Sequence, residues 1–383
     1  MKKTIYFLSL LLLFACEGQN KKQVKTTSIP TIESTIPLAI GTYTRKEGHV
    51  DGKAAGIYIY SFNTVTGALN HLSTTGKITN PSYLNVHPNG QYIYAVSEVA
   101  DEEKGAPVYA YQYDDNTNTL NLLNESSTLG NYPCYVEVSP SGEVLAAANY
   151  GSGNITLIPL EKNGALGTPS SEDQHRGQGP NEARQEGPHA HMAYFNGANQ
   201  VLSTDLGTDQ IHIYSTENQQ LKIEKVLSLS AGAGPRHLAV HPQNQQLYVV
   251  DELKGNVSTF SENHELIAET SYLNNEEEEA AGGDIIIDQA GKYLYVSNRG
   301  NSNSITVFAI GTELKKVGHF STLGKTPRAI TFSPDGKFLL AANQDSGDIA
   351  VFEINAESGL PQREGKVYKI PTPVCMKWVL PKK

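Results

Sequence analysis

Four residues in separate parts of this sequence have side chains suited to the hydrolysis of an ester: His189, Arg236, Glu252 and Arg299. A neutral histidine can take a proton from water near pH 7. Either arginine can stabilise a tetrahedral oxyanion, or hold a carboxylate or phosphate through two hydrogen bonds. We expect His189 to be the base and Arg236 to clamp an anion. Glu252 has three open roles: a second acid or base, an orienter of the histidine, or a partner that holds an arginine in place.

These four residues fall in successive copies of one repeated segment. The copies begin at Pro81, Pro133, Pro188, Pro235, Gly283, Pro327 and, in part, Pro373. They start roughly 50 residues apart, and each holds short apolar runs separated by turns such as Asn-Gly and Asp-Gly, which tolerate positive φ. A period of this size, with strands and no helical stretches, predicts an all-β fold: a seven-bladed β-propeller with four antiparallel strands per blade.

The two ends of the repeat region complete one blade between them. The segment from Pro373 onward reads as a first strand with no second strand after it, and residues 36–75 supply three further strands. Pairing the N- and C-terminal strands closes the ring and removes exposed sheet edges. We expect residues 36–383 to form a single domain, because blades cannot bury their faces alone.

Propeller geometry indicates where polar side chains gather. The first and second strands of a blade are antiparallel, so the start of the first and the end of the second lie on one face, near the central channel. These positions are far more polar than the strand interiors. The substrate-binding candidates there and in adjoining segments are His191, Arg184, Gln185, His237, Glu98, Asn149, Tyr150, Asp205, Asn298 and Gln344.

A structural role competes with the functional one for part of this set. Asn and Asp beside turns commonly satisfy backbone groups, which applies to Asn149, Asp205, Asp251, Asn298 and Asn343. The four proposed catalytic residues are not favoured in turns, and a charged side chain aimed at a channel needs a partner or a ligand.

The segment GPNEARQEGPHAHMAYF and the strings GPRHLAVHP, VVDELKGNVSTF and VSNRGNSNSITVF resemble the seven-bladed lactonase family. That family groups propeller-type 6-phosphogluconolactonases with fungal 3-carboxy-muconate cycloisomerases. The resemblance covers essentially all of the chain after residue 35. It implies a lactone hydrolase that acts on a small sugar lactone, with His189, Arg236, Glu252 and Arg299 as its functional set. Two other functions stay open: an isomerase of a carboxylated muconolactone that uses the same groups, and a non-catalytic envelope propeller that binds a ligand or a protein.

The longest polar insertion between repeats, residues 172–187, joins a fourth strand to the next first strand. It is therefore expected on the same face as the polar pocket. His175, Arg176, Arg184 and Gln185 are candidates for a rim that binds an anionic substrate. A solvated loop is the equal alternative for His175 and Arg176.

Metal and cofactor sites are not expected. His189 and His191 have a spacing that can ligate zinc, but no cysteine pair or further ligand at motif spacing accompanies them. No Walker loop or dinucleotide fingerprint is present. Cys134 and Cys375 are expected to be free buried thiols. Histidines in turns or outer strands, expected at the surface or in hydrogen bonds, are His71, His87, His212, His241, His264 and His319.

The N-terminus has the pattern of a secretory signal. A Met-Lys-Lys start and an apolar run precede Leu13 to Cys16, which resembles a bacterial lipobox. We expect residues 1–16 to be a lipoprotein-type signal, with Cys16 as the lipid anchor, and residues 17–35 to be a flexible tether. An ordinary signal peptide is the alternative. The protein is then expected in the periplasm or cell envelope, or in the cytoplasm if this segment is not a signal.

The net charge of −10 and the absence of a Lys/Arg-rich run after the signal argue against nucleic acid as a partner. We expect a monomer that meets the membrane only through Cys16. A phosphorylated sugar lactone is a cytoplasmic metabolite, so an envelope location favours a different lactone as the substrate.

Overall fold

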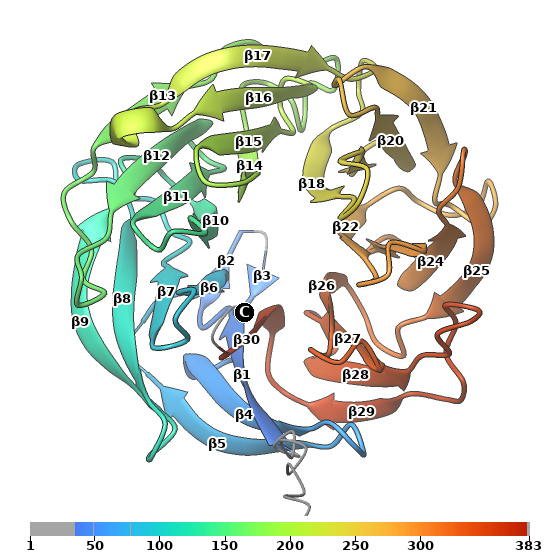
Figure 1. The fold of residues 1–383 in the computed structure, drawn as a ribbon, viewed down its shortest axis with the longest axis horizontal. Helices are drawn as coiled ribbons and strands as arrows, with labels where there is room; N and C mark the ends of the chain where they lie inside the picture. Colours follow the sequence, from blue (N-terminus) through green and yellow to red (C-terminus); the bar gives the residue numbers. More distant parts are fainter. Residues whose placement is uncertain (1–34, 49, 77, 381–383) are drawn as a thin grey trace, which may run out of the picture. The chain divides into compact units, whose positions relative to one another are not determined.

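The computed structural model describes residues 35–48, 50–76 and 78–380, and these form seven four-stranded antiparallel sheets (Figure 1). The expected signal peptide, with Cys16, lies outside the described residues, as does nearly all of the expected tether. From the innermost strand outward, the sheets are β30 (Pro373–Trp378), β1 (Thr35–Thr42), β4 (Ile57–Asn63), β5 (Leu69–Thr75); β6 (Leu84–Val86), β7 (Tyr92–Val96), β8 (Pro107–Asp114), β9 (Thr119–Ser127); β10 (Pro133–Val138), β11 (Val144–Asn149), β12 (Asn154–Pro159), β13 (Ser171–Gln174); β14 (Ala190–Phe195), β15 (Gln200–Asp205), β16 (Gln210–Ser215), β17 (Lys222–Ser228); β18 (Pro235–Val240), β19 (Leu247–Asp251), β20 (Asn256–Phe260), β21 (Leu266–Ser271); β22 (Gly282–Ile287), β23 (Tyr293–Asn298), β24 (Ser304–Ala309), β25 (Lys315–Ser321); and β26 (Pro327–Phe332), β27 (Phe338–Asn343), β28 (Asp348–Glu353), β29 (Lys366–Lys369).

The innermost strands form a closed ring. Each contacts the next in the order β30, β6, β10, β14, β18, β22 and β26, and β26 returns to β30. The chain ends close one blade, because β30 pairs antiparallel with β1, placing Leu38 opposite Trp378 and Gly41 opposite Cys375. The predicted seven-bladed propeller is confirmed.

Burial explains why inner and outer strands differ in sequence. The second strand β11, VLAAAN, is buried at every position because neighbouring blades cover both of its faces. Its run of alanines suits this close packing. The outermost strand β17, KIEKVLS, is exposed at all but one position. Outer strands therefore carry weaker apolar patterns than inner ones.

Strand pairing brings the polar positions to one face, as expected. In three of the blades Pro133 lies opposite Asn149, Pro235 opposite Asp251, and Pro327 opposite Asn343. Turns at the other end of these strands use glycine in the left-handed region, as at Gly142, with φ of 76°.

The bulges at the starts of the first strands decide which side chains face the channel. In the pairing of first with second strands, some residues have no partner opposite them. These are Cys134 in β10, His191 in β14, Arg236 and His237 in β18, and Arg328 in β26. A bulge re-aims the side chain of the extra residue. By register Ala190 is the equivalent of Pro133 and Pro235, so His191, and not His189, occupies the same position as Cys134 and Arg236. Aligning the copies at Pro188 and Pro235 would make His189 the equivalent of Arg236, and the structure shows that this alignment is wrong by two residues.

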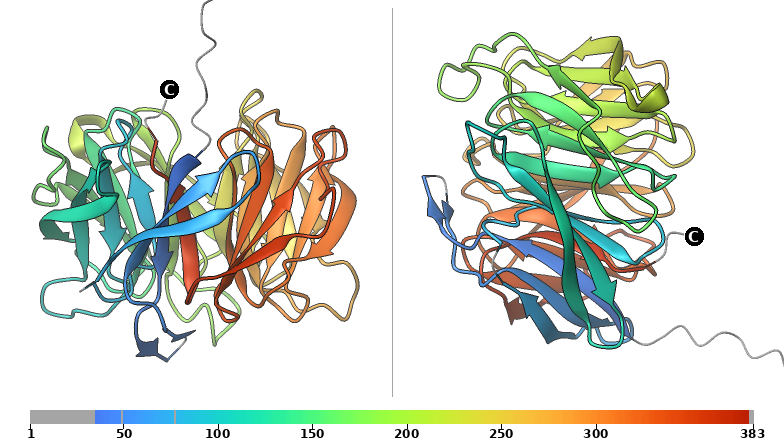
Figure 2. Two further views of the ribbon diagram at one scale, coloured as in Figure 1. Left: turned by 90° about the horizontal axis from the view of Figure 1, so that it is seen from below. Right: turned by 90° about the vertical axis from the view of Figure 1, so that its left-hand side faces the viewer.

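Two small elements complete the described chain. The hairpin β2 (Lys46–Glu47) and β3 (Val50–Asp51) follows the end of β1 and projects from the face where first strands begin (Figure 2). A 3-10 helix, η1, spans Glu217–Gln219. Within the described ranges, no helix has the length and apolar character needed to cross a bilayer.

Candidate active site

A cavity of about 730 Å³ opens at the face where the first strands begin. Its wall consists of Glu98, Tyr132, Cys134, Tyr150, Gly151, Arg184, Glu186, His189, His191, Arg236, Glu252, Ala281, Arg299, Thr326, Arg328, Gln344 and Asp345. These residues come from six of the seven blades and from the 172–187 insertion with its continuation to β14. Polar groups thus converge on one concave site near the channel axis.

Glu252, directly after β19, is the centre of an ionic cluster. Its Oε1 accepts a hydrogen bond from Arg184 Nη2 at 2.6 Å, and its Oε2 accepts one from Arg236 Nη1 at 2.7 Å. Arg299 Nη2 lies 2.7 Å from the same Oε2. The Glu252 side chain is only 3 % exposed. Three guanidinium groups therefore share one buried carboxylate.

This arrangement determines the charge of Glu252. Burial alone would raise its pKa, but the charges of Arg299, Arg236 and Arg184 outweigh burial and hold the pKa of Glu252 well below its usual value. A carboxylate with such a low pKa is a poor proton acceptor near pH 7. Of its three open roles, the contacts match the partner that holds arginines.

Backbone contacts fix two of the arginines further. Arg236 Nε donates to the carbonyl of Gly283 at 2.7 Å, and Arg299 Nη2 donates to the carbonyl of Gly282 at 2.9 Å. Burial and the neighbouring Arg236 charge lower the pKa of Arg299 to about 10, which leaves it cationic at pH 7. Backbone carbonyls and Glu252 together thus hold both guanidinium groups in place.

His189 lies at the cavity wall with a defined tautomer. Its Nδ1 is 2.9 Å from the carbonyl oxygen of Tyr150, and a carbonyl can only accept, so Nδ1 carries the proton. Nε2 lies 3.2 Å from Glu186 Oε1, which also can only accept, so this contact is a hydrogen bond only when the ring carries both protons. The Tyr150 ring stacks on the imidazole, with centroids 4.4 Å apart. These contacts fix the orientation of the imidazole and place a carboxylate beside its Nε2.

His191 is a second imidazole in the same wall. Burial, followed by the charge of Arg236, lowers the pKa of His191 well below its usual value, so it is neutral at pH 7. Tyr150 contacts it edge-on, with ring centroids 5.6 Å apart. Among the described residues, no hydrogen-bond partner is found for its Nδ1.

The opposite wall holds a second acid and a fourth arginine. Tyr43 OH donates to Glu98 Oε1 at 2.7 Å. The Arg328 guanidinium lies 3.7 Å from Glu98 Oε2 and 5.4 Å from the centre of the Tyr43 ring. This pair is close to neutral overall, whereas the Glu252 cluster carries an excess of two positive charges.

Comparison with known proteins agrees with the seven-bladed fold. Residues 37–378 match the model of the family described as lactonase, 7-bladed beta-propeller. The chain belongs to the lactonase family. It is 35% identical over 350 residues to a Bacillus subtilis protein named 6-phosphogluconolactonase, covering 89% of this chain and 97% of the relative. A Formosa agariphila protein of the same name is 32% identical, covering 85% and 94%.

The fold is also similar to that of solved structures. A Bacteroides fragilis structure has a TM-score of 0.82 at 33% identity, covering 91% of this chain and 99% of that one. The periplasmic gluconolactonase of Pseudomonas aeruginosa has a TM-score of 0.81 at 25% identity, covering 90% and 99%.

Most of the expected site residues of this lactonase-family chain lie together. The structure places at the cavity wall all four proposed catalytic residues and five of the proposed substrate-binding residues, namely Glu98, Tyr150, Arg184, His191 and Gln344. They come from distant parts of the sequence, and the ring of blades brings them together.

Three predicted substrate-binding residues instead satisfy backbone groups and do not line the cavity. Asn149 Nδ2 donates to the carbonyl of Thr128. Asp205 Oδ1 accepts from the backbone N–H of His189 and of Gly207. Asn298 caps the neighbouring turns in the same way. The contacts of these residues therefore match the alternative given above, in which Asn and Asp beside turns satisfy backbone groups.

Two further substrate-binding predictions are also corrected. Gln185 is fully buried behind the wall, where its Nε2 donates to Asp209 Oδ1 at 2.7 Å. His237 is paired with Asp284 at 2.9 Å and lines a separate cavity of about 550 Å³ at the far ends of the first strands. The proposed rim is partly wrong as well, because His175 is buried, with its Nδ1 hydrogen-bonded to Asp205 Oδ2 at 2.7 Å, whereas Arg176 is exposed.

The sequence reasoning did not select several wall residues. Arg328 follows a strand-opening proline just as Arg236 does, so a signal for it was present. Glu186 lies inside the GPNEARQEGPHAH string. Thr326 and Asp345 adjoin the polar positions but carry no signal of their own.

The two cysteines of the propeller are free and buried, as predicted. Burial raises the pKa of the Cys134 thiol to about 12, so this wall residue is not a thiolate near neutral pH. In the described part of the chain, the one group of three side chains spaced for a metal ion lies outside this cavity.

Proposed function

We propose that this chain hydrolyses the ester bond of a sugar lactone in the cavity around Glu252. One observation carries the proposal: a buried carboxylate holds three guanidinium groups beside an oriented histidine. Binding an anion and activating water are the two tasks of lactone hydrolysis, and the cavity has groups for both.

The contacts suggest a sequence of proton transfers. Nε2 of His189 takes a proton from water, and the resulting hydroxide attacks the lactone carbonyl carbon. Arg236 or Arg299 stabilises the tetrahedral oxyanion. When the ring C–O bond breaks, the imidazolium returns the proton to the leaving alkoxide, which gives the open hydroxy acid. Glu186 stabilises the imidazolium in between. Glu252 keeps the arginines in position and does not titrate.

The cavity wall as a whole has four arginines and four acidic residues, but its positive charge is concentrated at the Glu252 cluster. This favours a substrate whose acidic group reaches that cluster. The names of the Bacillus subtilis and Formosa agariphila relatives support a phosphorylated gluconolactone. The name of the Pseudomonas aeruginosa protein supports an unphosphorylated one. We further propose that the N-terminal segment anchors this protein in the cell envelope through Cys16, where an unphosphorylated sugar lactone or a sugar-acid lactone is the accessible substrate.

The direct test is a panel of lactones given to the purified chain. Acid release is followed with 6-phosphogluconolactone, gluconolactone and a uronic-acid lactone, and absorbance is followed with carboxymuconate. Hydrolysis of at least one sugar lactone well above the spontaneous rate is expected. A folded protein that leaves all the sugar lactones at their spontaneous rate would overturn the proposal, and activity on carboxymuconate alone would make the chain a cycloisomerase.

A further inference from the structure

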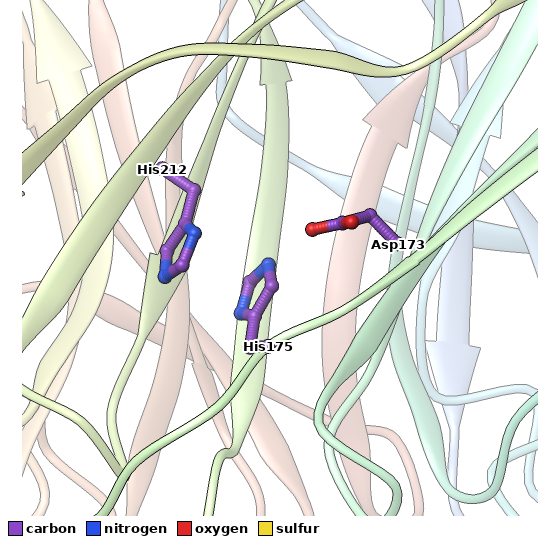
Figure 3. Close-up of side chains that lie close together, drawn as sticks. All are labelled: Asp173, His175 and His212. Carbon is purple, nitrogen blue, oxygen red and sulfur yellow. The ribbon is translucent and has the colours of Figure 1, made fainter.

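A second group of chemically suitable side chains lies away from the cavity, between two neighbouring blades. Asp173 belongs to β13, the outermost strand of one blade, and His175 directly follows this strand. His212 belongs to β16 of the next blade. Figure 3 shows the two imidazole rings side by side, with the Asp173 carboxylate next to them. One potential ligand atom from each residue lies within 4.8 Å of the others.

Three of the four imidazole nitrogens of this group are buried without a partner among the residues that the structure describes. His175 is 2% exposed and His212 is 5% exposed. Within the described residues, Nε2 of His175 and both ring nitrogens of His212 have no hydrogen-bond partner. Buried polar atoms are nearly always hydrogen-bonded, so three unpaired nitrogens in one place call for a ligand.

Neighbouring side chains orient two of the three groups. His175 Nδ1 lies 2.7 Å from Asp205 Oδ2, so this nitrogen carries the proton and Nε2 is left with its lone pair. Tyr214 OH donates to Asp173 Oδ2 at 2.8 Å. A carboxylate behind a histidine, and a hydrogen bond behind a ligating carboxylate, are the supports typical of metal ligands.

We propose that Asp173, His175 and His212 bind a divalent transition-metal ion, for which Zn²⁺ is the best match to two imidazoles and one carboxylate. A tetrahedral zinc site needs ligand atoms about 3.3 Å apart, given Zn–N distances of about 2.0 Å. The two rings are stacked with centroids 3.9 Å apart, so His212 turns about its side-chain torsions when the ion binds. Partly exposed Asp173 gives the ion a route from solvent, and water takes the fourth position.

The ion would join two blades and support the active site from outside it. Asp205 connects the two sites, because its Oδ2 contacts His175 and its Oδ1 accepts the backbone N–H of His189 at 2.8 Å. The proposed site therefore has a structural role. It differs from the sequence-based expectation of no metal site, for which His189 and His191 were the histidine pair with zinc-ligand spacing. It does not depend on the proposed lactone hydrolysis.

The test is zinc binding by the full chain without a polyhistidine tag. After treatment with a chelator, Zn²⁺ is titrated by calorimetry, and the bound metal is measured by elemental mass spectrometry. We expect one zinc per wild-type chain and a melting temperature that rises with Zn²⁺ concentration. A chain that binds no zinc above the buffer background overturns the proposal.

Three variants locate the site. His212→Phe keeps the stack on His175 and removes no hydrogen bond, so the protein should fold but lose its one zinc. Asp173→Asn keeps an acceptor for Tyr214 and should bind zinc at least ~10-fold more weakly, as an uncharged ligand replaces a charged one. His71→Ala, at an exposed histidine, should bind like the wild type. Unchanged zinc stoichiometry and affinity in His212→Phe would contradict the assignment.

Discussion

At the scale of single residues, Glu252 is the acidic side chain that pairs with three arginines of the cavity wall. It is the shared counter-charge of Arg184, Arg236 and Arg299, and it is almost completely buried. Removing one partner of a buried ionic group leaves the others uncompensated in a medium of low polarity. Its replacement should therefore affect the whole protein and not only the reaction.

We predict that Glu252→Gln lowers the free energy of unfolding by about 3–5 kcal/mol, because buried guanidiniums lose their counter-charge. Urea unfolding followed by circular dichroism measures this. Arg184→Gln is the matched control, since its side chain is 41% exposed and its loss should cost much less. Equal effects of the two substitutions would show that Glu252 is not the centre of the cluster.

Substitutions can distinguish which of His189 and His191 acts as the general base. We predict that His189→Ala lowers kcat for lactone hydrolysis by roughly 10²–10⁴, the usual contribution of a general base, with little change in melting temperature. His264→Ala, in a surface turn, should leave kcat unchanged. If His191→Gln abolishes turnover while His189→Ala retains it, the base is His191, which holds the bulge position shared with Arg236.

Asp251, the last residue of β19, gives the stability a pH dependence. Burial raises the pKa of Asp251 to about 8, so the folded state keeps a proton that the unfolded state loses near pH 4. Between these values, rising pH lowers the free energy of unfolding through this group, by up to about 1.4 kcal/mol per pH unit. We predict that the stability difference between Asp251→Asn and wild type shifts in favour of the variant from pH 5 to 8. A difference independent of pH would refute this.

At the scale of elements, each blade has a buried inner half and an exposed outer half. Strand β11 packs small alanines between neighbouring sheets, and Ala147 has no exposed surface. Outer strands such as β17 present their side chains to solvent. The same type of substitution should therefore have very different effects in the two positions.

We predict that Ala147→Leu destabilises the protein by about 1–3 kcal/mol, because the added atoms must fit into a close-packed space. Ile223→Ala in β17 is the comparison, since Ile223 is 46% exposed and its change should stay within about 0.5 kcal/mol. Chemical denaturation of both variants gives the two values. A tolerated leucine at 147 would mean that the blades separate there.

At the scale of the whole propeller, β30 is the link that closes the ring. It pairs with β1 and contacts β26 and β6 across the junction. Without it, β1 is left as an edge and two blades lose a neighbour. Since every blade covers part of the next one, local loss of the junction weakens the cavity as well.

We predict that a chain ending at Thr372 loses lactone hydrolysis, and elutes as aggregates or unfolded protein in size-exclusion chromatography, because an unpaired edge invites association. A chain that lacks only residues 381–383 serves as the control and should behave like the wild type. A truncated protein that stays monomeric with an unchanged melting temperature would show that closure by β30 is dispensable.

The sequence alone was sufficient to predict the blades and the face on which the polar positions gather. The repeated apolar runs and glycine turns define strands, because a strand buried on both faces must be apolar throughout. The antiparallel order of those strands then places the polar ends together. The four proposed catalytic residues follow from that placement and from the types of their side chains.

Only the tertiary structure decided which polar residues face the cavity. Alternation along a strand assigns side chains to faces, but bulges at the starts of β10, β14, β18 and β26 break that alternation. As a result Arg328 belongs to the wall. Asn149 and Asp205, at the ends of second strands, instead contact backbone groups. The sharing of Glu252 by three arginines is equally invisible in the sequence, because it depends on distances between blades that are set only when the ring closes.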